Sequence, residues 1–224
     1  MLCRALIHRG IEMIEKEPLS ADMWIQRGIS LAKTGRYDEA LESFERAIEL
    51  DPSRADAWTD RSSAQNNLGH YKDALESALE SIKIDPHQAR TWIVKGFALH
   101  NLGRYEESVE SYARAIELDP QGADSRRAWN NRGAALDNLK RHEEAIDSYE
   151  EAIMIDPFDG YAWNNKGVAL SALSRNDEAL MCFRKAVEID PLYTTAWKNM
   201  SMSLRALGRD DEAKEAEKLA EDLD

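Results

Sequence analysis

Asparagine recurs at fixed intervals in this chain, in a pattern that could bind a peptide. The segments AWNNRGAAL (128–136), AWNNKGVAL (162–170) and AWKNMSMSL (196–204) begin 34 residues apart and share one asparagine position. That first series comprises Asn131, Asn165 and Asn199. A second series comprises Asn67, Asn101 and Asn138. A carboxamide both donates and accepts hydrogen bonds, so a row of carboxamides can bond the backbone of an extended peptide whatever its side chains are.

Other chemistry has little support in the sequence. The five histidines do not pair at a metal-binding spacing, and the chain has neither a glycine-rich phosphate loop nor a nucleophile elbow. The two cysteines, Cys3 and Cys182, stand alone in the sequence and cannot by themselves form a disulfide framework or a metal site. We therefore predict a protein that is not an enzyme and that has no metal site and no cofactor.

Composition excludes two classes of partner. The formal net charge of -13 opposes binding to a phosphate backbone, so we expect no nucleic-acid partner. The sequence has no apolar run of about 18 residues, and charged residues interrupt its start at helical spacing, so we expect neither a membrane span nor a signal peptide. These observations predict a cytoplasmic protein.

The elements that position the asparagines are marked by tryptophan and proline. Successive tryptophans, and successive prolines, are 34 residues apart except for one interval of 37 in each series. The tryptophans are Trp24, Trp58, Trp92, Trp129, Trp163 and Trp197, and the prolines are Pro18, Pro52, Pro86, Pro120, Pro157 and Pro191. A fixed period of this length indicates a stack of similar units.

Each unit has the pattern of two helices. With tryptophan placed fourth, small residues recur at the eighth and twentieth places, and apolar residues follow at helical spacings of three and four. Breaks such as TGRYDEA (34–40) separate the two helices. Glycine suits the left-handed residue after a helix end, and the acidic residues suit the first turn of the next helix.

These residues resemble the tetratricopeptide repeat (TPR) family over essentially the whole chain. The resemblance implies an all-α fold, a right-handed solenoid of antiparallel helix pairs whose first helices line a concave groove. The expected single domain, residues 1–224, divides into an N-terminal half-repeat helix (1–20), six repeats (21–54, 55–88, 89–122, 126–159, 160–193 and 194–224) and an insertion (123–125). The last repeat should end in a polar cap helix, and the second repeat should be the loosest packed.

The resemblance also implies which residues face the groove, namely those at places 2, 5, 6, 9, 12 and 13. Both asparagine series then face it. The charged candidates are Asp56, Asp60, Arg90, Arg127, Lys198 and Arg205, and the apolar candidates are Ile25, Ile93 and Phe97. This polarity favours a ligand with a basic part toward the first repeats and an acidic part toward the last. Two alternatives stay open: the sixth-place asparagines bridge to adjacent helices, and Phe97 packs between helices. The family's carboxylate clamp for chaperone tails is disfavoured, because the ninth place is never asparagine.

We therefore predict an adaptor or scaffold that binds a peptide or helical segment of a partner protein. The alternative is a self-assembling structural protein, in which a homodimer forms through residues 1–17. Those residues have the pattern of the second helix of a repeat whose first helix is missing. One apolar face of this helix would have no packing partner in the sequence. Three explanations stay open. A chain segment upstream that covered this face was cut away, or another molecule covers it, or the helix is a degenerate N-terminal cap of the stack that needs no cover. The insertion at 123–125 either offsets the stack or is a neutral surface change.

Overall fold

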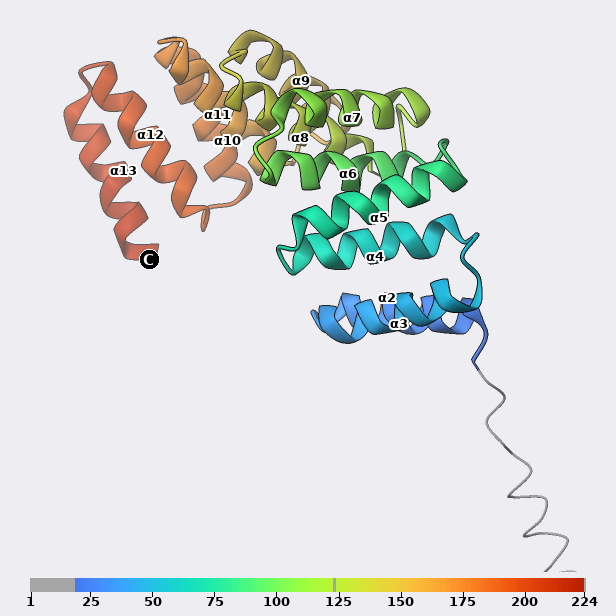
Figure 1. The fold of residues 1–224 in the computed structure, drawn as a ribbon. Helices are drawn as coiled ribbons and strands as arrows, with labels where there is room; N and C mark the ends of the chain where they lie inside the picture. Colours follow the sequence, from blue (N-terminus) through green and yellow to red (C-terminus); the bar gives the residue numbers. More distant parts are fainter. Residues whose placement is uncertain (1–18, 123, 224) are drawn as a thin grey trace, which may run out of the picture. The chain divides into compact units, whose positions relative to one another are not determined.

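The computed structural model describes residues 19–122 and 124–223, which fall into two compact units that divide after Pro86. Within these residues it contains twelve helices and no strand (Figure 1), as the all-α prediction requires. The first unit holds α2 (Ala21–Lys33), α3 (Tyr37–Leu50), α4 (Ala55–Asn67) and α5 (Tyr71–Ile84). The second unit holds α6 (Ala89–Asn101), α7 (Tyr105–Leu118), α8 (Ser125–Asn138), α9 (His142–Ile155), α10 (Gly160–Ala172), α11 (Asn176–Ile189), α12 (Thr194–Ala206) and α13 (Asp210–Leu223).

Consecutive helices pack as pairs, and within each unit the pairs stack in chain order. The pairs are α2 with α3 and α4 with α5 in the first unit, and α6 with α7, α8 with α9, α10 with α11 and α12 with α13 in the second. Within the second unit α7 contacts α8, α9 contacts α10, and α11 contacts α12. Each pair therefore buries its apolar stripe against its neighbours in sequence, as in a stacked array.

The first helix of each described pair is followed by a residue with left-handed backbone conformation, and in four of the six pairs this residue is glycine. Gly35, Gly69, Gly103 and Gly208 have φ between 71° and 79°, which confirms the predicted helix breaks. In five of the six described pairs an arginine then precedes the second helix and pairs with a glutamate three residues later, whereas His70 stands before α5. These pairs are Arg36–Glu39, Arg104–Glu107, Arg141–Glu144, Arg175–Glu178 and Arg209–Glu212, at 2.5 to 2.7 Å.

Lys140 and Ser174 occupy the left-handed position where the other breaks have glycine, with φ of 62° and 61°. A side chain with a Cβ is strained in that region. We expect Lys140→Gly and Ser174→Gly each to raise the free energy of unfolding by about 0.5 to 1 kcal/mol, measured by urea denaturation. Gly208→Ser is the matched reverse change and should lower it. Equal stability of Ser174→Gly and the parent chain would contradict this reading.

The interface within a pair depends on an aromatic ring that lies against glycine. Phe44, Tyr112, Tyr149 and Phe183 are buried in the second helix of their pairs. Each ring lies so close to a glycine of the first helix that a Cβ there would be 2.5 to 2.8 Å from it. The glycines are Gly28, Gly96, Gly133 and Gly167. The small residue predicted at the eighth place is thus required by direct contact.

Three of the tryptophans join their helices to the preceding loops. The indole Nε1–H of Trp58 donates to the carbonyl oxygen of Pro52 at 3.1 Å, and Trp197 bonds Pro191 in the same way at 2.9 Å. Trp163 repeats the bond with the carbonyl of Pro157 at 3.0 Å. These bonds tie the first turn of each of these helices to the loop before it.

The pair formed by α4 and α5 is closed by polar contacts. Here Ala78 stands in place of the aromatic ring. The buried Ser81 hydroxyl lies 2.8 Å from the Thr59 hydroxyl, and Ser77 donates to Gln65 Oε1 at 2.7 Å. Hydrogen bonds therefore take over part of the role that apolar packing has in the other pairs. That this repeat is the loosest packed stays a prediction.

Several predicted features fall at the ends of the chain and at the insertion. Residues 1–17, with the proposed dimer helix, lie outside the described residues. In the insertion, α8 already begins at Ser125, whose buried hydroxyl donates to the carbonyl oxygens of Asp119 and Gly122 at 2.8 and 2.9 Å. In α13, Ala213, Ala216 and Ala220 are buried, whereas Lys214 and Glu221 are exposed. The predicted repeat boundaries and the single continuous domain stay predictions.

Candidate functional site

The first helices of the pairs in the second unit form one continuous face. The contacts α6 with α8, α8 with α10 and α10 with α12 place these helices side by side. Their ninth-place residues carry the apolar part of this face. These residues are Phe97, Ala134, Val168 and Met202, of which all but Ala134 are exposed. The row has no covering element in the part of the chain that the structure describes, and such surfaces commonly mark contacts with other molecules.

The first asparagine series bridges adjacent helices. Asn165 donates through Nδ2 to Asn130 Oδ1 at 3.2 Å, and Asn199 donates to Asn164 Oδ1 at 2.9 Å. The buried Asn164 lies 3.4 Å from Asn165 Oδ1. These bonds support the structural alternative left open by the sequence. They also fix the orientation of the Asn199 carboxamide at the edge of the face.

The second series bonds its own helices. Asn67, Asn101 and Asn138 are exposed, and each Nδ2 donates at 2.8 Å to the carbonyl oxygen four residues earlier. One amide donor of each side chain is therefore already engaged. The carboxamide oxygens are left to accept, so this series is suited to a ligand that donates hydrogen bonds.

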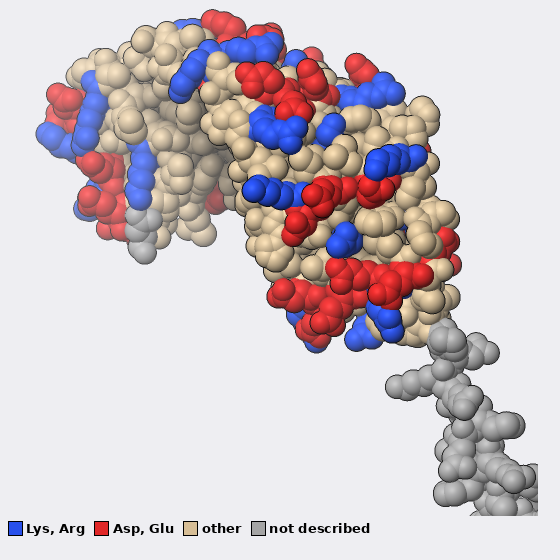
Figure 2. All heavy atoms as spheres, viewed as in Figure 1, with Lys and Arg blue, Asp and Glu red and all other residues tan. Residues whose placement is uncertain are grey.

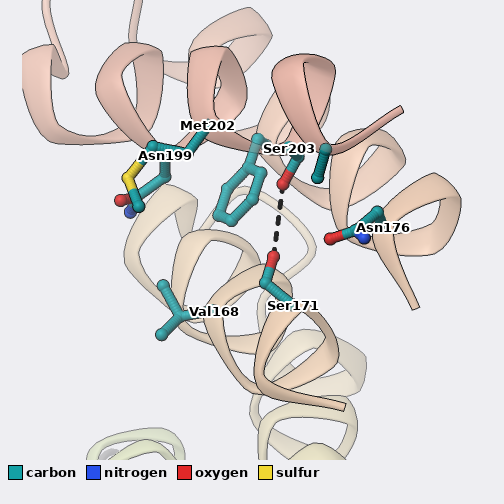
Figure 3. Close-up of a pocket in the computed structure, with 8 residues that line it drawn as sticks. Val168, Ser171, Asn176, Asn199, Met202 and Ser203 are labelled. Carbon is teal, nitrogen blue, oxygen red and sulfur yellow. Dashed lines mark hydrogen bonds between the residues drawn. The ribbon is translucent and has the colours of Figure 1, made fainter. Parts of the chain in front are cut away.

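A pocket of about 280 Å³ lies between α10 and α12, with α11 behind it. It is lined by Val168, Ser171, Asn176, Phe183, Asn199, Met202, Ser203 and Ala206. Figure 3 shows the Ser171 and Ser203 hydroxyls facing each other between the two helices, 3.2 Å apart. Ala206 occupies the thirteenth place, where Asn138 and its equivalents stand in earlier repeats. Of the residues that line this pocket, only Asn199 was predicted as a site residue.

Three predicted groove residues are buried, so their side chains are not exposed on a surface, and their part in a binding site stays a prediction. Ile25 and Ile93 are each 3% exposed and belong to apolar clusters between helices. Asp60 is also buried. Ile25 and Ile93 occupy the fifth place of α2 and α6. Their side chains point to a neighbouring helix, because the next helix pair packs against this side of the helix. Phe97, in contrast, is exposed on the face.

The predicted charged residues are partly neutralised by neighbours. Arg54 bonds Asp56 at 2.7 Å, and this contact lowers the pKa of Asp56 below its usual range. Arg127 lies 3.5 Å from Asp124, and Arg205 pairs with Glu217. Arg90 and Lys198 are exposed. The proposed ligand polarity therefore has weaker support than the apolar row.

Carboxylates dominate the surface of the first unit. Exposed examples on α3 and α5 are Asp38, Glu42, Asp73 and Glu76. Figure 2 shows acidic side chains in bands over α2 to α5. This surface accords with the net charge of -13.

Comparisons with protein families give the same result along the chain. Family profiles described as tetratricopeptide repeat match residues 25–89, 89–121, 127–159 and 160–193. The chain belongs to the tetratricopeptide repeat family. The resemblance inferred from tryptophan, proline and glycine spacing is thereby confirmed. A comparison of this TPR chain with curated proteins gives no match.

Solved TPR structures share the fold. PilW, described as a widely conserved type IV pilus biogenesis factor, is 22% identical with a TM-score of 0.82, over 88% of this chain and 90% of that one. YrrB, described as a TPR protein with an unusual peptide-binding site, is 23% identical with a TM-score of 0.64, over 84% and 94%. MamA from Desulfovibrio magneticus RS-1 is 21% identical with a TM-score of 0.68, over 75% and 94%. At these identities the likeness establishes the fold alone.

One polar cluster on the TPR face was missed by sequence reasoning. Asp137 lies 2.8 Å from His142 Nδ1 and accepts a hydrogen bond from the Tyr149 hydroxyl at 2.9 Å. Burial, together with the charge of Asp137, raises the pKa of Tyr149. Tyr149 therefore stays a hydrogen-bond donor at physiological pH. Asp137 is a second fixed acceptor near the asparagine series.

In residues 19–122 and 124–223 no three histidine, cysteine or acidic side chains are grouped so that they could hold a metal ion. In the same ranges no helix of this TPR protein is long and apolar enough to cross a membrane.

Proposed function

We propose that this TPR chain is a non-enzymatic scaffold that binds a peptide or helical segment of a partner protein on the face formed by α6, α8, α10 and α12. The family and the related structures support the general role of a protein-interaction scaffold. The proposed location rests on the exposed apolar row and on the pocket beside Met202.

The chemistry of this face favours an apolar anchor with a hydrogen-bonded backbone. Met202 and Val168 are exposed side chains at the mouth of the pocket, and burying them under a ligand would remove apolar area from water. Methionine is flexible and adapts to ligand side chains of different shapes. The carboxamide of Asn199, held by Asn164, lies beside this apolar surface and can orient a peptide group.

The sharpest test places a charge in the pocket. A peptide selected from a random phage-displayed library against the whole chain is titrated by isothermal calorimetry. We expect Met202→Glu to weaken its binding about tenfold or more, because a ligand would have to desolvate the new carboxylate. Replacing the sixth-place asparagines is a poorer test, because it would also remove the bridges between helices.

Met181 provides the matched control. It lies on α11 away from the pocket lining and is 69% exposed, compared with 67% for Met202. Met181→Glu should leave the affinity unchanged, and circular dichroism should show the same helicity for both variants. Equal affinity of the Met181→Glu and Met202→Glu variants would place the binding surface elsewhere.

A further inference from the structure

A second cavity lies at the loops that join the last three pairs of the second unit. It has a volume of about 290 Å³ and shares no residue with the pocket beside Met202. Its walls come from the start of α8, the α9–α10 loop and the α11–α12 loop. The residues that matter here are Arg126, Phe158, Asp159, Tyr161, Asp190 and Tyr193.

Aromatic side chains form the outer wall of this cavity. The Tyr161 and Tyr193 ring centroids are 5.0 Å apart, with the planes tilted by 57°. Phe158 is 80% exposed and Tyr161 is 64% exposed. Large aromatic side chains that stay exposed to water do not contribute the stabilising free energy that their burial would provide.

The fold itself does not require aromatic residues at these places. At the equivalent places of the α3–α4 junction the chain has Ser53, Arg54 and Asp56, and that junction forms with the same helix geometry. The aromatic wall is therefore a property of the last junctions, and it calls for an explanation other than stacking of the pairs.

The cavity has an excess of negative charge. Arg126 pairs with the buried Asp159 and lies 3.8 Å from Asp156. Asp190 also lines the cavity, and within the described residues no lysine or arginine pairs with it. Burial, followed by the nearby Tyr161, Asp159 and Asp190, raises the pKa of Tyr193, as expected in negatively charged surroundings.

We propose that this cavity binds the guanidinium group of an arginine side chain from a partner protein. The planar guanidinium can lie against the tyrosine rings and donate to the Asp190 carboxylate. Arg126 is itself part of the wall, where its guanidinium pairs with the buried Asp159, so Asp190 is the carboxylate that the proposal assigns to the ligand. This proposal does not depend on peptide binding beside Met202.

The test uses the whole chain and N-acetyl-arginine amide as the probe, titrated by nuclear magnetic resonance of isotope-labelled tyrosine. We expect saturable shifts of the Tyr161 and Tyr193 signals. Asp190→Asn keeps an oxygen that can accept the Leu192 backbone N–H, as Asp190 does at 3.0 Å, but removes the charge. We expect this variant, and Tyr161→Ala, to bind the probe about tenfold more weakly.

Three controls make the outcome decisive. Tyr161→Phe keeps the ring and should retain binding, and Met202→Glu should bind the probe like the parent chain. The neutral N-acetyl-norleucine amide should produce no saturable shift. The proposal is overturned if the norleucine or lysine amide binds as tightly as the arginine amide, or if Asp190→Asn has no effect.

Discussion

Replacing Gly167 by alanine is expected to lower the free energy of unfolding by about 3 kcal/mol, measured by urea denaturation followed by circular dichroism. A Cβ at this position would lie 2.5 Å from Cε1 of Phe183. That ring is almost fully buried in the largest apolar cluster, with Leu180 and Val187 of the same helix. Because a close-packed interior gives the ring no room to retreat, the two helices must move apart.

Gly160 is the matched control for this change, because it lies in the same helix, α10. A Cβ there would lie 3.4 Å from the Ala186 carbonyl oxygen, with no closer neighbour. Alanine has the higher helix propensity, so Gly160→Ala should be neutral or stabilising by up to about 1 kcal/mol. A loss below about 1 kcal/mol for Gly167→Ala would show that the pairs tolerate wider separation.

The second large effect is expected at Asp159. This buried carboxylate accepts from the backbone N–H groups of Tyr161 and Ala162 at 3.0 and 3.2 Å, and it pairs with Arg126 of α8, in the preceding helix pair. It therefore caps α10 and joins two pairs. We expect Asp159→Ala to lower the free energy of unfolding by about 3 kcal/mol, since the cap is lost and Arg126 loses its main partner.

Two further variants separate the effect of losing the helix cap from the effect of losing the ion pair with Arg126. Asp159→Asn keeps an oxygen for the cap and should cost about half as much as alanine. Ser20→Ala removes a simple exposed cap, in which Ser20 accepts from the Met23 N–H at 3.3 Å, and should cost about 1 kcal/mol. If Asp159→Ala cost no more than Ser20→Ala, the link to Arg126 would add nothing to stability. Both variants are measured by urea denaturation.

Repetition made the fold predictable. Six tryptophans at a nearly constant period identify a unit, and the glycine at its eighth place meets an aromatic ring in four of the described pairs. These contacts lie within one pair, so the same local pattern predicts the same local structure each time. The left-handed Lys140 and Ser174 were not predictable in this way, because neither residue type favours that region.

The candidate site was less predictable, because it depends on contacts between units. Consecutive helical residues point about 100° apart, so neighbouring places on a helix can face a ligand or the next pair. Ile93 and Phe97 of α6 were both predicted to face the groove, but Ile93 is buried and Phe97 is exposed. Asn199, predicted to face the groove, lines the pocket between α10 and α12, and its bond to Asn164 depends on the stacking distance between these two helices.

The hydrogen bonds from the indole rings to the preceding loops make tryptophan fluorescence a local probe of the helix array. Trp58, Trp163 and Trp197 are each tied by the ring N–H to a proline carbonyl, so each ring senses the junction at the start of its own pair. Indole fluorescence shifts to longer wavelength when the ring becomes solvated. A set of single-tryptophan chains, with phenylalanine in the other five positions, would thus report the opening of individual junctions, and would show whether the array melts from one end or all together.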